Sequence, residues 1–192
     1  AFYNMGNVLK DQNKLEKAVK AYKKSILLKP DSAKVYNNMG NALKGLGKLN
    51  ESLTSYNMSI TIDNNYADAY NNMGLILNDQ GEKDKAIGLF QKCISLRPDY
   101  ANAYNNMGLT LKDQGNFDKA IQAFAKAVFL ETNYAEAYYN LGLTLKEQGE
   151  FDEAVEAYDR ALSLKPDYFE AYNNKGNALK DQGKLEEAIS TY

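Results

Sequence analysis

The same short pattern of residues recurs along this chain every 34 residues. A tyrosine is followed four residues later by a glycine, and in nearly every copy an alanine lies twelve residues beyond that glycine. The tyrosines are Tyr36, Tyr70, Tyr104, Tyr138 and Tyr172, with Phe2 at the same place in the first copy. A fixed period of this length indicates one small structural unit stacked on copies of itself. Such an array has no single core that closes around an active site, so the search for function moves to the surface that the units share.

Counted from the residue three before each tyrosine, the complete units are 33–66, 67–100, 101–134 and 135–168. Residues 1–32 and 169–192 are incomplete units, and we expect all of 1–192 to form one array. Because the chain begins and stops inside units, we also expect it to be a segment of a longer protein. Positions are counted below from the first residue of a unit, so the tyrosine is at position 4 and the glycine at position 8.

Each unit has residues that begin and end helices at fixed places. A second glycine, or Asn13 in the first unit, separates two helical stretches, where the end of a helix favours a left-handed residue. Proline follows the second stretch in three units, at Pro30, Pro98 and Pro166. The N-caps that we expect for the first stretches are Asn65, Asn133 and Asp167.

The residues of unit 135–168 resemble the signature of the tetratricopeptide repeat family. They read Tyr138-x2-Leu141-Gly142-x2-Leu145, then Ala154-x3-Tyr158 and Pro166, with tyrosine in place of the usual tryptophan. The resemblance covers the whole chain. It implies an all-α fold in which antiparallel helix pairs stack into a right-handed superhelical solenoid with a concave inner face.

The buried side of the first helix follows from its period. At about 100° per residue, positions 4, 7, 8 and 11 share one arc, which in unit 101–134 holds Tyr104, Met107, Gly108 and Leu111. The matching residues of the second helix are Ala120, Phe124 and Ala127. The small residues let the helices approach closely while the aromatic ring fills the space between them.

The opposite arc holds positions 2, 5, 6, 9, 12 and 13, which we expect to face solvent in the inner groove. Position 6 is asparagine in every unit: Asn4, Asn38, Asn72, Asn106, Asn140 and Asn174. A carboxamide complements a peptide bond, because it offers two donors and an acceptor. A similar asparagine ladder lines the repeat region of O-linked N-acetylglucosamine transferases, which implies that these residues clamp the main chain of an extended polypeptide. The alternative is that duplication copied the asparagine with the rest of the unit.

Selectivity for particular peptides would come from neighbours of the ladder. Position 9 is leucine in the middle units, at Leu75, Leu109 and Leu143, and Tyr139 lies beside them at position 5. Burying one such leucine contributes about 1.5–3 kcal/mol before ordering costs. We therefore expect these four residues to contact a bound peptide, although single exposed apolar residues are also normal on protein surfaces.

Composition excludes several classes of function. A net charge of -2 and the absence of a basic run argue against binding to nucleic acid or to an anionic membrane. The chain has no histidine, no cluster of metal ligands and no glycine-rich phosphate loop, so we expect no enzyme activity, no cofactor and no metal. Its one cysteine, Cys93, excludes an internal disulfide and is expected to be a small buried residue. No targeting signal fixes a compartment, and a cytoplasmic location is favoured.

These observations favour a non-catalytic scaffold that binds an extended polypeptide. One alternative is the substrate-targeting arm of a larger enzyme, such as a glycosyltransferase, whose catalytic domain lies outside this segment. Another is a structural protein that assembles end to end through its terminal repeats. The second alternative follows from Tyr192, which would occupy a normally buried position with no following repeat to cover it.

Overall fold

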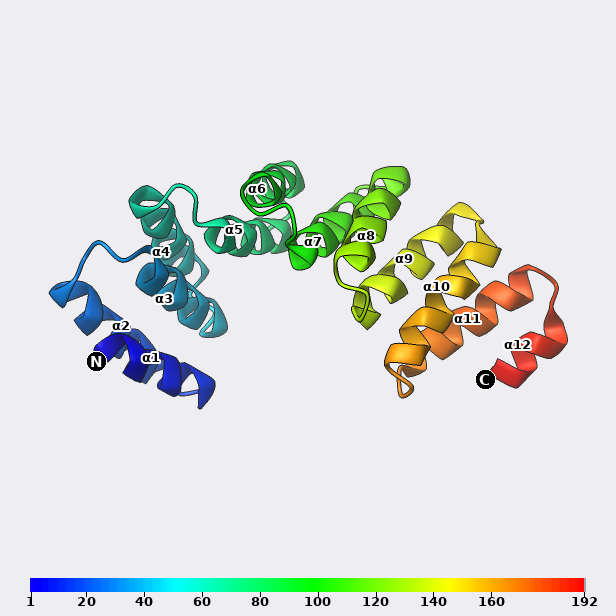
Figure 1. Cartoon of the computed structure of the whole chain (residues 1–192), viewed down its shortest axis with the longest axis horizontal. Coiled ribbons are helices and arrows are strands. Elements are labelled where there is room, and N and C mark those ends of the chain that lie inside the picture. The colour runs from blue at the N-terminus through cyan, green and yellow to red at the C-terminus, as the bar shows by residue number, and fades with distance from the viewer. Residues whose placement is uncertain (192) are drawn as a thin grey trace. The chain divides into compact units, whose positions relative to one another are not determined.

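The computed structural model describes residues 1–191, and in that range the chain is a series of α-helices without strands (Figure 1). The helices form successive antiparallel pairs, joined within each pair by turns of two to four residues. The prediction of an all-α solenoid of helix pairs is therefore confirmed. Tyr192 lies outside the described residues.

The chain divides into two larger units of three helix pairs each, residues 1–98 and 99–192. From here on, the first and second units are these two parts of the chain, and each 34-residue copy is called a repeat. The first unit contains α1 (Phe2–Asp11), α2 (Leu15–Leu28), α3 (Ala33–Gly45), α4 (Leu49–Ile62), α5 (Ala67–Asp79) and α6 (Lys83–Leu96). The second unit contains α7 (Ala101–Lys112), α8 (Phe117–Leu130), α9 (Ala135–Gln148), α10 (Phe151–Leu164), α11 (Phe169–Asp181) and α12 (Leu185–Thr191).

The turns within the helix pairs depend on residues with a left-handed backbone. The glycine of each turn has a positive φ, for example 84° at Gly149, and Asn13 has a φ of 57°. The chain then turns back because Gly149 and Glu150 donate their N–H groups to carbonyls of the last turn of α9. The predicted helix ends are confirmed, as are the prolines, each of which follows the C-cap residue of a second helix.

The predicted N-caps are wrong by one residue. The N-cap residues of α5, α9 and α11 are Tyr66, Tyr134 and Tyr168, and none of them caps its helix with a side-chain hydrogen bond. A tyrosine is used here for packing, since the Tyr168 ring lies 4.8 Å from the Tyr139 ring of the preceding first helix. Contact between repeats has displaced the local capping chemistry that the sequence favours.

The core of each helix pair from α1–α2 to α9–α10 is built on a glycine that touches an aromatic ring. A Cβ on Gly108 would lie only 2.7 Å from Cε1 of Phe124, and a Cβ on Gly142 would lie 2.8 Å from Cε1 of Tyr158. Both rings are fully buried. The close approach of the two helices therefore requires the missing side chain of position 8.

The buried surface of the first helices is wider than a single arc. In the repeats after the first, positions 3 and 10, which include Ala103 and Thr110, are fully or almost fully buried, whereas Tyr104 and Met107 are only half-buried. The reason is that a first helix packs on three elements. Besides its own second helix it contacts the second helix of the preceding pair, as α9 contacts α8, and a neighbouring first helix, as α9 contacts α7.

The glycine contact gives a direct test of this core. We expect Gly108→Ala to lower the free energy of unfolding by about 1–3 kcal/mol, because its methyl group must push against a fully buried ring. Gly88→Ala is the matched control, since Gly88 also lies inside a helix but a Cβ there meets nothing within 4 Å. That change should stabilise the protein by about 0.5–1 kcal/mol through helix propensity. Urea denaturation of both variants measures the difference, and equal effects would contradict the packing described.

Candidate binding face of the first helices

The predicted site residues lie on one face of the first helices, which we call the asparagine face. In the first unit it comprises the position 5, 6 and 9 residues of α1, α3 and α5, and in the second those of α7, α9 and α11. Each unit brings its own set together, because neighbouring first helices pack side by side. The two sets are described in turn.

In the first unit, the ladder asparagines are bound to the preceding repeat. The Nδ2 group of Asn72 donates to Oδ1 of Asn37 at 3.0 Å and to Oδ1 of Asn41 at 3.1 Å. Asn38 repeats this arrangement one helix earlier, where Oδ1 of Asn7 and the hydroxyl of Tyr3 are the acceptors. Both N–H groups of each ladder residue are therefore used inside the protein.

In the second unit the same contacts are made with fewer partners. Nδ2 of Asn140 donates to Oδ1 of Asn105 at 3.1 Å. Nδ2 of Asn174 donates to the Tyr139 hydroxyl at 3.1 Å and to the carbonyl of Glu170 in its own helix at 2.9 Å. Asn106 also has an interaction partner. The loss of one acceptor follows from position 9, where Leu109 replaces the asparagine found in the first unit.

The expectation that positions 5 and 6 face solvent is wrong for several of these residues. Asn105 is 1% exposed and Asn140 is 6% exposed. In an isolated helix these positions lie opposite the core, but here the next first helix covers them. The hydrogen bonds of position 6 with positions 5 and 9 of the preceding repeat could have been inferred from the sequence, because asparagine recurs at all three positions. Periodicity within one helix gives no such signal.

The predicted apolar residues remain partly accessible. Leu75 in the first unit, and Leu109, Leu143 and Tyr139 in the second, are all half-buried. They leave apolar surface beside asparagine side chains, a combination that suits a ligand with alternating polar and apolar groups.

Buried aromatic residues lie beneath position 9, which sequence reasoning about the face did not include. The Tyr22 hydroxyl donates to Oδ1 of Asn7 at 2.9 Å, and the Tyr56 hydroxyl donates to Oδ1 of Asn41 at 2.7 Å. Burial raises the pKa of Tyr56 to about 12, so the hydroxyl remains a donor at neutral pH. The sequence contains a signal for this contact, because both repeats of the first unit that have asparagine at position 9 also have tyrosine at position 24.

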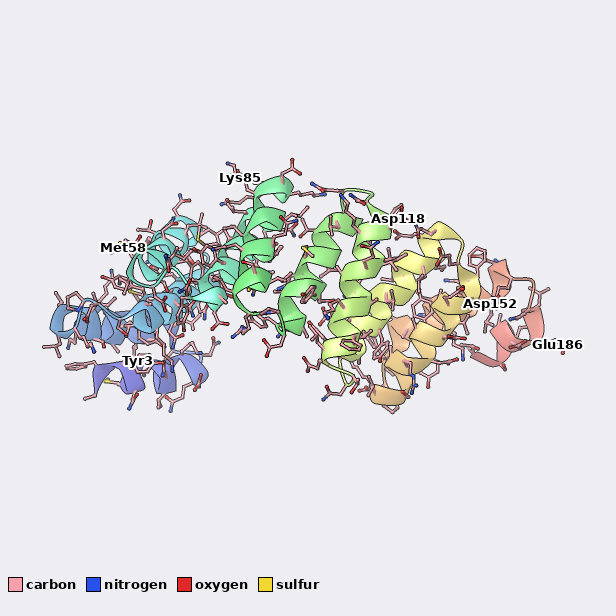
Figure 2. The ribbon with its side chains drawn as sticks, turned by 45° about the horizontal axis from the view of Figure 1, so that its top comes forward. Tyr3, Met58, Lys85, Asp118, Asp152 and Glu186 are labelled. Atoms are coloured by element: carbon pink, nitrogen blue, oxygen red, sulfur yellow. The ribbon has the colours of Figure 1, made fainter. Side chains whose placement is uncertain are left out.

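The remaining chemistry of the described residues is sparse. Cys93 is fully buried, as predicted, and burial raises the pKa of its thiol to about 11. Within residues 1–191 no group of three or more histidine, cysteine, aspartate or glutamate side chains could hold a metal ion. No helix in that range is both long enough and apolar enough to cross a membrane. Charged side chains such as Lys85 of α6 project into solvent (Figure 2).

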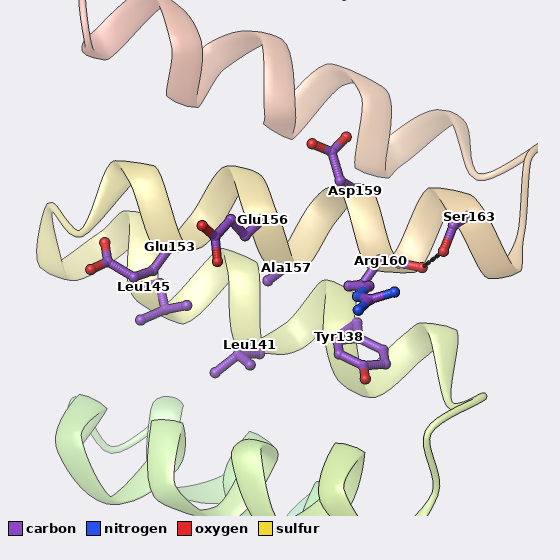
Figure 3. Close-up of a pocket in the computed structure, with 9 residues that line it drawn as sticks. All are labelled: Tyr138, Leu141, Leu145, Glu153, Glu156, Ala157, Asp159, Arg160 and Ser163. Carbon is purple, nitrogen blue, oxygen red and sulfur yellow. Dashed lines mark hydrogen bonds between the residues drawn. The ribbon is translucent and has the colours of Figure 1, made fainter.

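An open hollow of about 690 Å³ lies on a different arc of α9 from the asparagine face. Figure 3 shows Leu141 of α9 and Glu153 and Glu156 of α10 among the residues that line it. The third carboxylate, Asp159, is bound to Lys175 at 2.6 Å. Leu141 and Leu145 of the lining belong to the core stripe of the helix pair, so the hollow lies at an edge of that core.

Comparison with known proteins agrees with this architecture. The family model described as "TPR repeat" matches residues 6–47, 40–81, 108–149 and 142–183, and a second model described as "Tetratricopeptide repeat" matches residues 65–128. Among curated proteins no match is found.

Several solved structures share the fold. One crystal structure of MamA is 30% identical, with a TM-score of 0.75, and the similarity covers 83% of this chain and 87% of that one. YrrB, described as "a TPR protein with an unusual peptide-binding site", is 25% identical with a TM-score of 0.69 over 88% of each chain. PilF of Pseudomonas aeruginosa is 18% identical and has a TM-score of 0.89 over 99% of this chain and 86% of its own, a likeness of fold alone.

The hydrogen bonds of the ladder predict a stability effect. We expect Asn72→Ala to lower the free energy of unfolding by about 1–2 kcal/mol, because two hydrogen bonds between α3 and α5 are lost. Asn57→Ala is the control, since that asparagine is exposed on α4 and should change stability by less than about 0.5 kcal/mol. Thermal unfolding followed by circular dichroism compares the two. An Asn72→Ala variant as stable as the control would show that the ladder contributes nothing to the fold.

Proposed function

We propose that this chain, which belongs to the tetratricopeptide repeat family, is a non-catalytic scaffold. In this proposal it binds an extended polypeptide along its asparagine face. Family members with a described peptide-binding site, such as YrrB, support this assignment. The proposed contacts are the ladder residues and the half-buried apolar residues beside them. They are Asn38, Asn72, Asn106, Asn140, Asn174, Leu75, Leu109, Leu143 and Tyr139.

The observation that carries the proposal is how the ladder carboxamides are held. The Nδ2 groups of Asn72 and Asn140 are bound inside the protein, while their Oδ1 atoms receive no hydrogen bond from the described residues. A carboxamide fixed at its nitrogen needs little further ordering when its oxygen accepts a hydrogen bond. Asn72 in the first unit and Asn140 in the second thus each offer an acceptor, and the complementary groups of an extended peptide are its main-chain N–H groups.

The apolar residues supply the second kind of contact. Leu109 and Leu143 lie at the same position of neighbouring helices in the second unit, and each retains accessible surface. Apolar side chains of a peptide that cover them gain the free energy of burial, whereas main-chain contacts to asparagine do not depend on peptide sequence. The expected ligand is therefore an uncharged extended segment with spaced apolar residues.

End-to-end self-association remains a separate prediction. Met5 and Val8 of α1 and Leu185 and Ile189 of α12 are largely exposed apolar residues. Light scattering over a concentration series checks it, and a constant monomeric mass would contradict it.

Peptide binding is tested with a displayed library of random dodecapeptides panned against the immobilised chain. Enriched peptides are synthesised and their affinities measured by fluorescence anisotropy. We expect Leu109→Ser to weaken their binding about tenfold or more, since the burial of one leucine contributes about 1.5–3 kcal/mol. Phe129→Ser, which alters an exposed apolar residue of α8, is the matched control and should leave affinity unchanged. No enrichment, or equal affinity for both variants, would contradict the proposal.

A further inference from the structure

Two repeats of this chain differ at one residue of an otherwise identical polar network. In the first repeat, Oδ1 of Asn7 accepts hydrogen bonds from the Tyr22 hydroxyl at 2.9 Å and from Nδ2 of Asn38 at 3.0 Å, while Tyr3 accepts the other N–H of Asn38 at 3.2 Å. The acceptor at position 9 therefore joins the core tyrosine to the ladder.

The repeat 135–168 has the same residues except at position 9, which is Leu143. Tyr139 still accepts from Asn174, at 3.1 Å. The second N–H of Asn174 turns to the carbonyl of Glu170 in its own helix. The Tyr158 hydroxyl, which would meet the missing acceptor, is buried and has no hydrogen-bond partner in residues 1–191.

The other repeats that have leucine at position 9 have no buried hydroxyl that needs an acceptor. Leu75 and Leu109 are matched at position 24 by Phe90 and Phe124, which have no hydroxyl. Among residues 1–191, Tyr158 is thus the position 24 tyrosine whose position 9 partner is apolar. A buried hydroxyl without a partner is costly and calls for a specific explanation.

We propose that the Tyr158 hydroxyl is a ligand-binding group, which donates a hydrogen bond to a main-chain carbonyl oxygen of the bound peptide. The carbonyl takes the place that Oδ1 of Asn7 occupies in the first repeat, and the half-buried Leu143 turns aside to admit it and contacts the adjacent apolar side chain. This inference rests on the function proposed above and assigns its selectivity to one repeat.

The surrounding charges favour a neutral carbonyl over a carboxylate. Burial is the main cause of the raised pKa of Tyr158 and of Tyr139, and the carboxylates of Glu147 and Glu170, respectively, raise the pKa of these hydroxyls further. A negative ligand group would be repelled by the same carboxylates. Tyr158 stays protonated at neutral pH and is therefore available as a donor.

The test uses two uncharged probes, N-acetyl-leucine methylamide and a blocked octapeptide of alternating serine and leucine. Neither contains a side-chain amide, so any carbonyl that binds is a main-chain carbonyl. Binding is followed by the ring carbon signals of ¹³C-labelled tyrosine, with the Tyr158 signal identified by its loss in Tyr158→Phe. The variants are Tyr158→Phe and Leu143→Asn, which supplies the missing acceptor, with Tyr56→Phe as the control.

We expect both probes to shift the Tyr158 signal. Tyr158→Phe and Leu143→Asn should each weaken octapeptide binding about tenfold, the effect of one hydrogen bond, while Tyr56→Phe changes it less than about twofold. Without ligand, Tyr158→Phe should not lower the melting temperature, whereas Tyr56→Phe should, because that hydroxyl is bound to Asn41. In the Leu143→Asn background, Tyr158→Phe should become destabilising.

Two results would overturn the inference while leaving the proposed function in place. One is octapeptide binding that Tyr158→Phe changes by less than about twofold. The other is a loss of melting temperature in Tyr158→Phe equal to that in Tyr56→Phe, which would mean that the hydroxyl is already bonded in the free protein. Failure of the wild-type chain to bind either probe would overturn both this inference and the proposed binding of uncharged peptides.

Discussion

In the pairs from α1–α2 to α9–α10, the contact between a glycine of the first helix and an aromatic ring of the second sets the geometry on which the rest of the structure depends. Because Gly108 and Gly142 lack a side chain, the rings of Phe124 and Tyr158 lie directly against the first helix. This close packing fixes the helix pair and leaves the edge of the ring beneath position 9. The residue at position 9 then decides whether a hydroxyl on that ring finds an acceptor, as in Tyr56 with Asn41, or does not, as in Tyr158 with Leu143. The asparagine face and the core are in this way linked through one side chain, the aromatic residue at position 24.

The proposed function gives the asparagine ladder two roles that one carboxamide can fill. In Asn72 and Asn140 the N–H groups bind the preceding repeat, and the oxygen is the proposed acceptor for a ligand. Asn72 donates to two acceptors of the preceding repeat and so contributes more to packing between repeats. Asn140 donates to one and keeps more of its hydrogen-bonding capacity. The difference comes from position 9, asparagine in Asn41 and leucine in Leu109. Leucine at this position therefore does more than add apolar surface, because it also removes an acceptor from the ladder.

Much of the fold could be predicted from the sequence, because its signals are local and repeated. The glycines of the turns and the prolines after the second helices are where the backbone requires them, and Gly108 and Phe124 are in the core as expected. The errors arose where one repeat meets the next. Asn105 was expected in solvent and is buried, and the cap expected at Asn133 is displaced by Tyr134. A helical period describes one helix and does not show which residues a neighbouring helix covers.

In the proposed binding mode, the ladder carboxamides are held at nitrogen and bind a peptide through oxygen. Nuclear magnetic resonance of the side-chain amides of Asn72 and Asn140, recorded during titration with a peptide enriched by panning, can detect both features. We expect the Nδ2 protons bonded inside the protein to be protected from exchange in the free chain and in the complex, and the carboxamide carbon signals to shift on binding. Rapid exchange of those protons in the free chain, or carbon signals that stay constant at saturation, would contradict it.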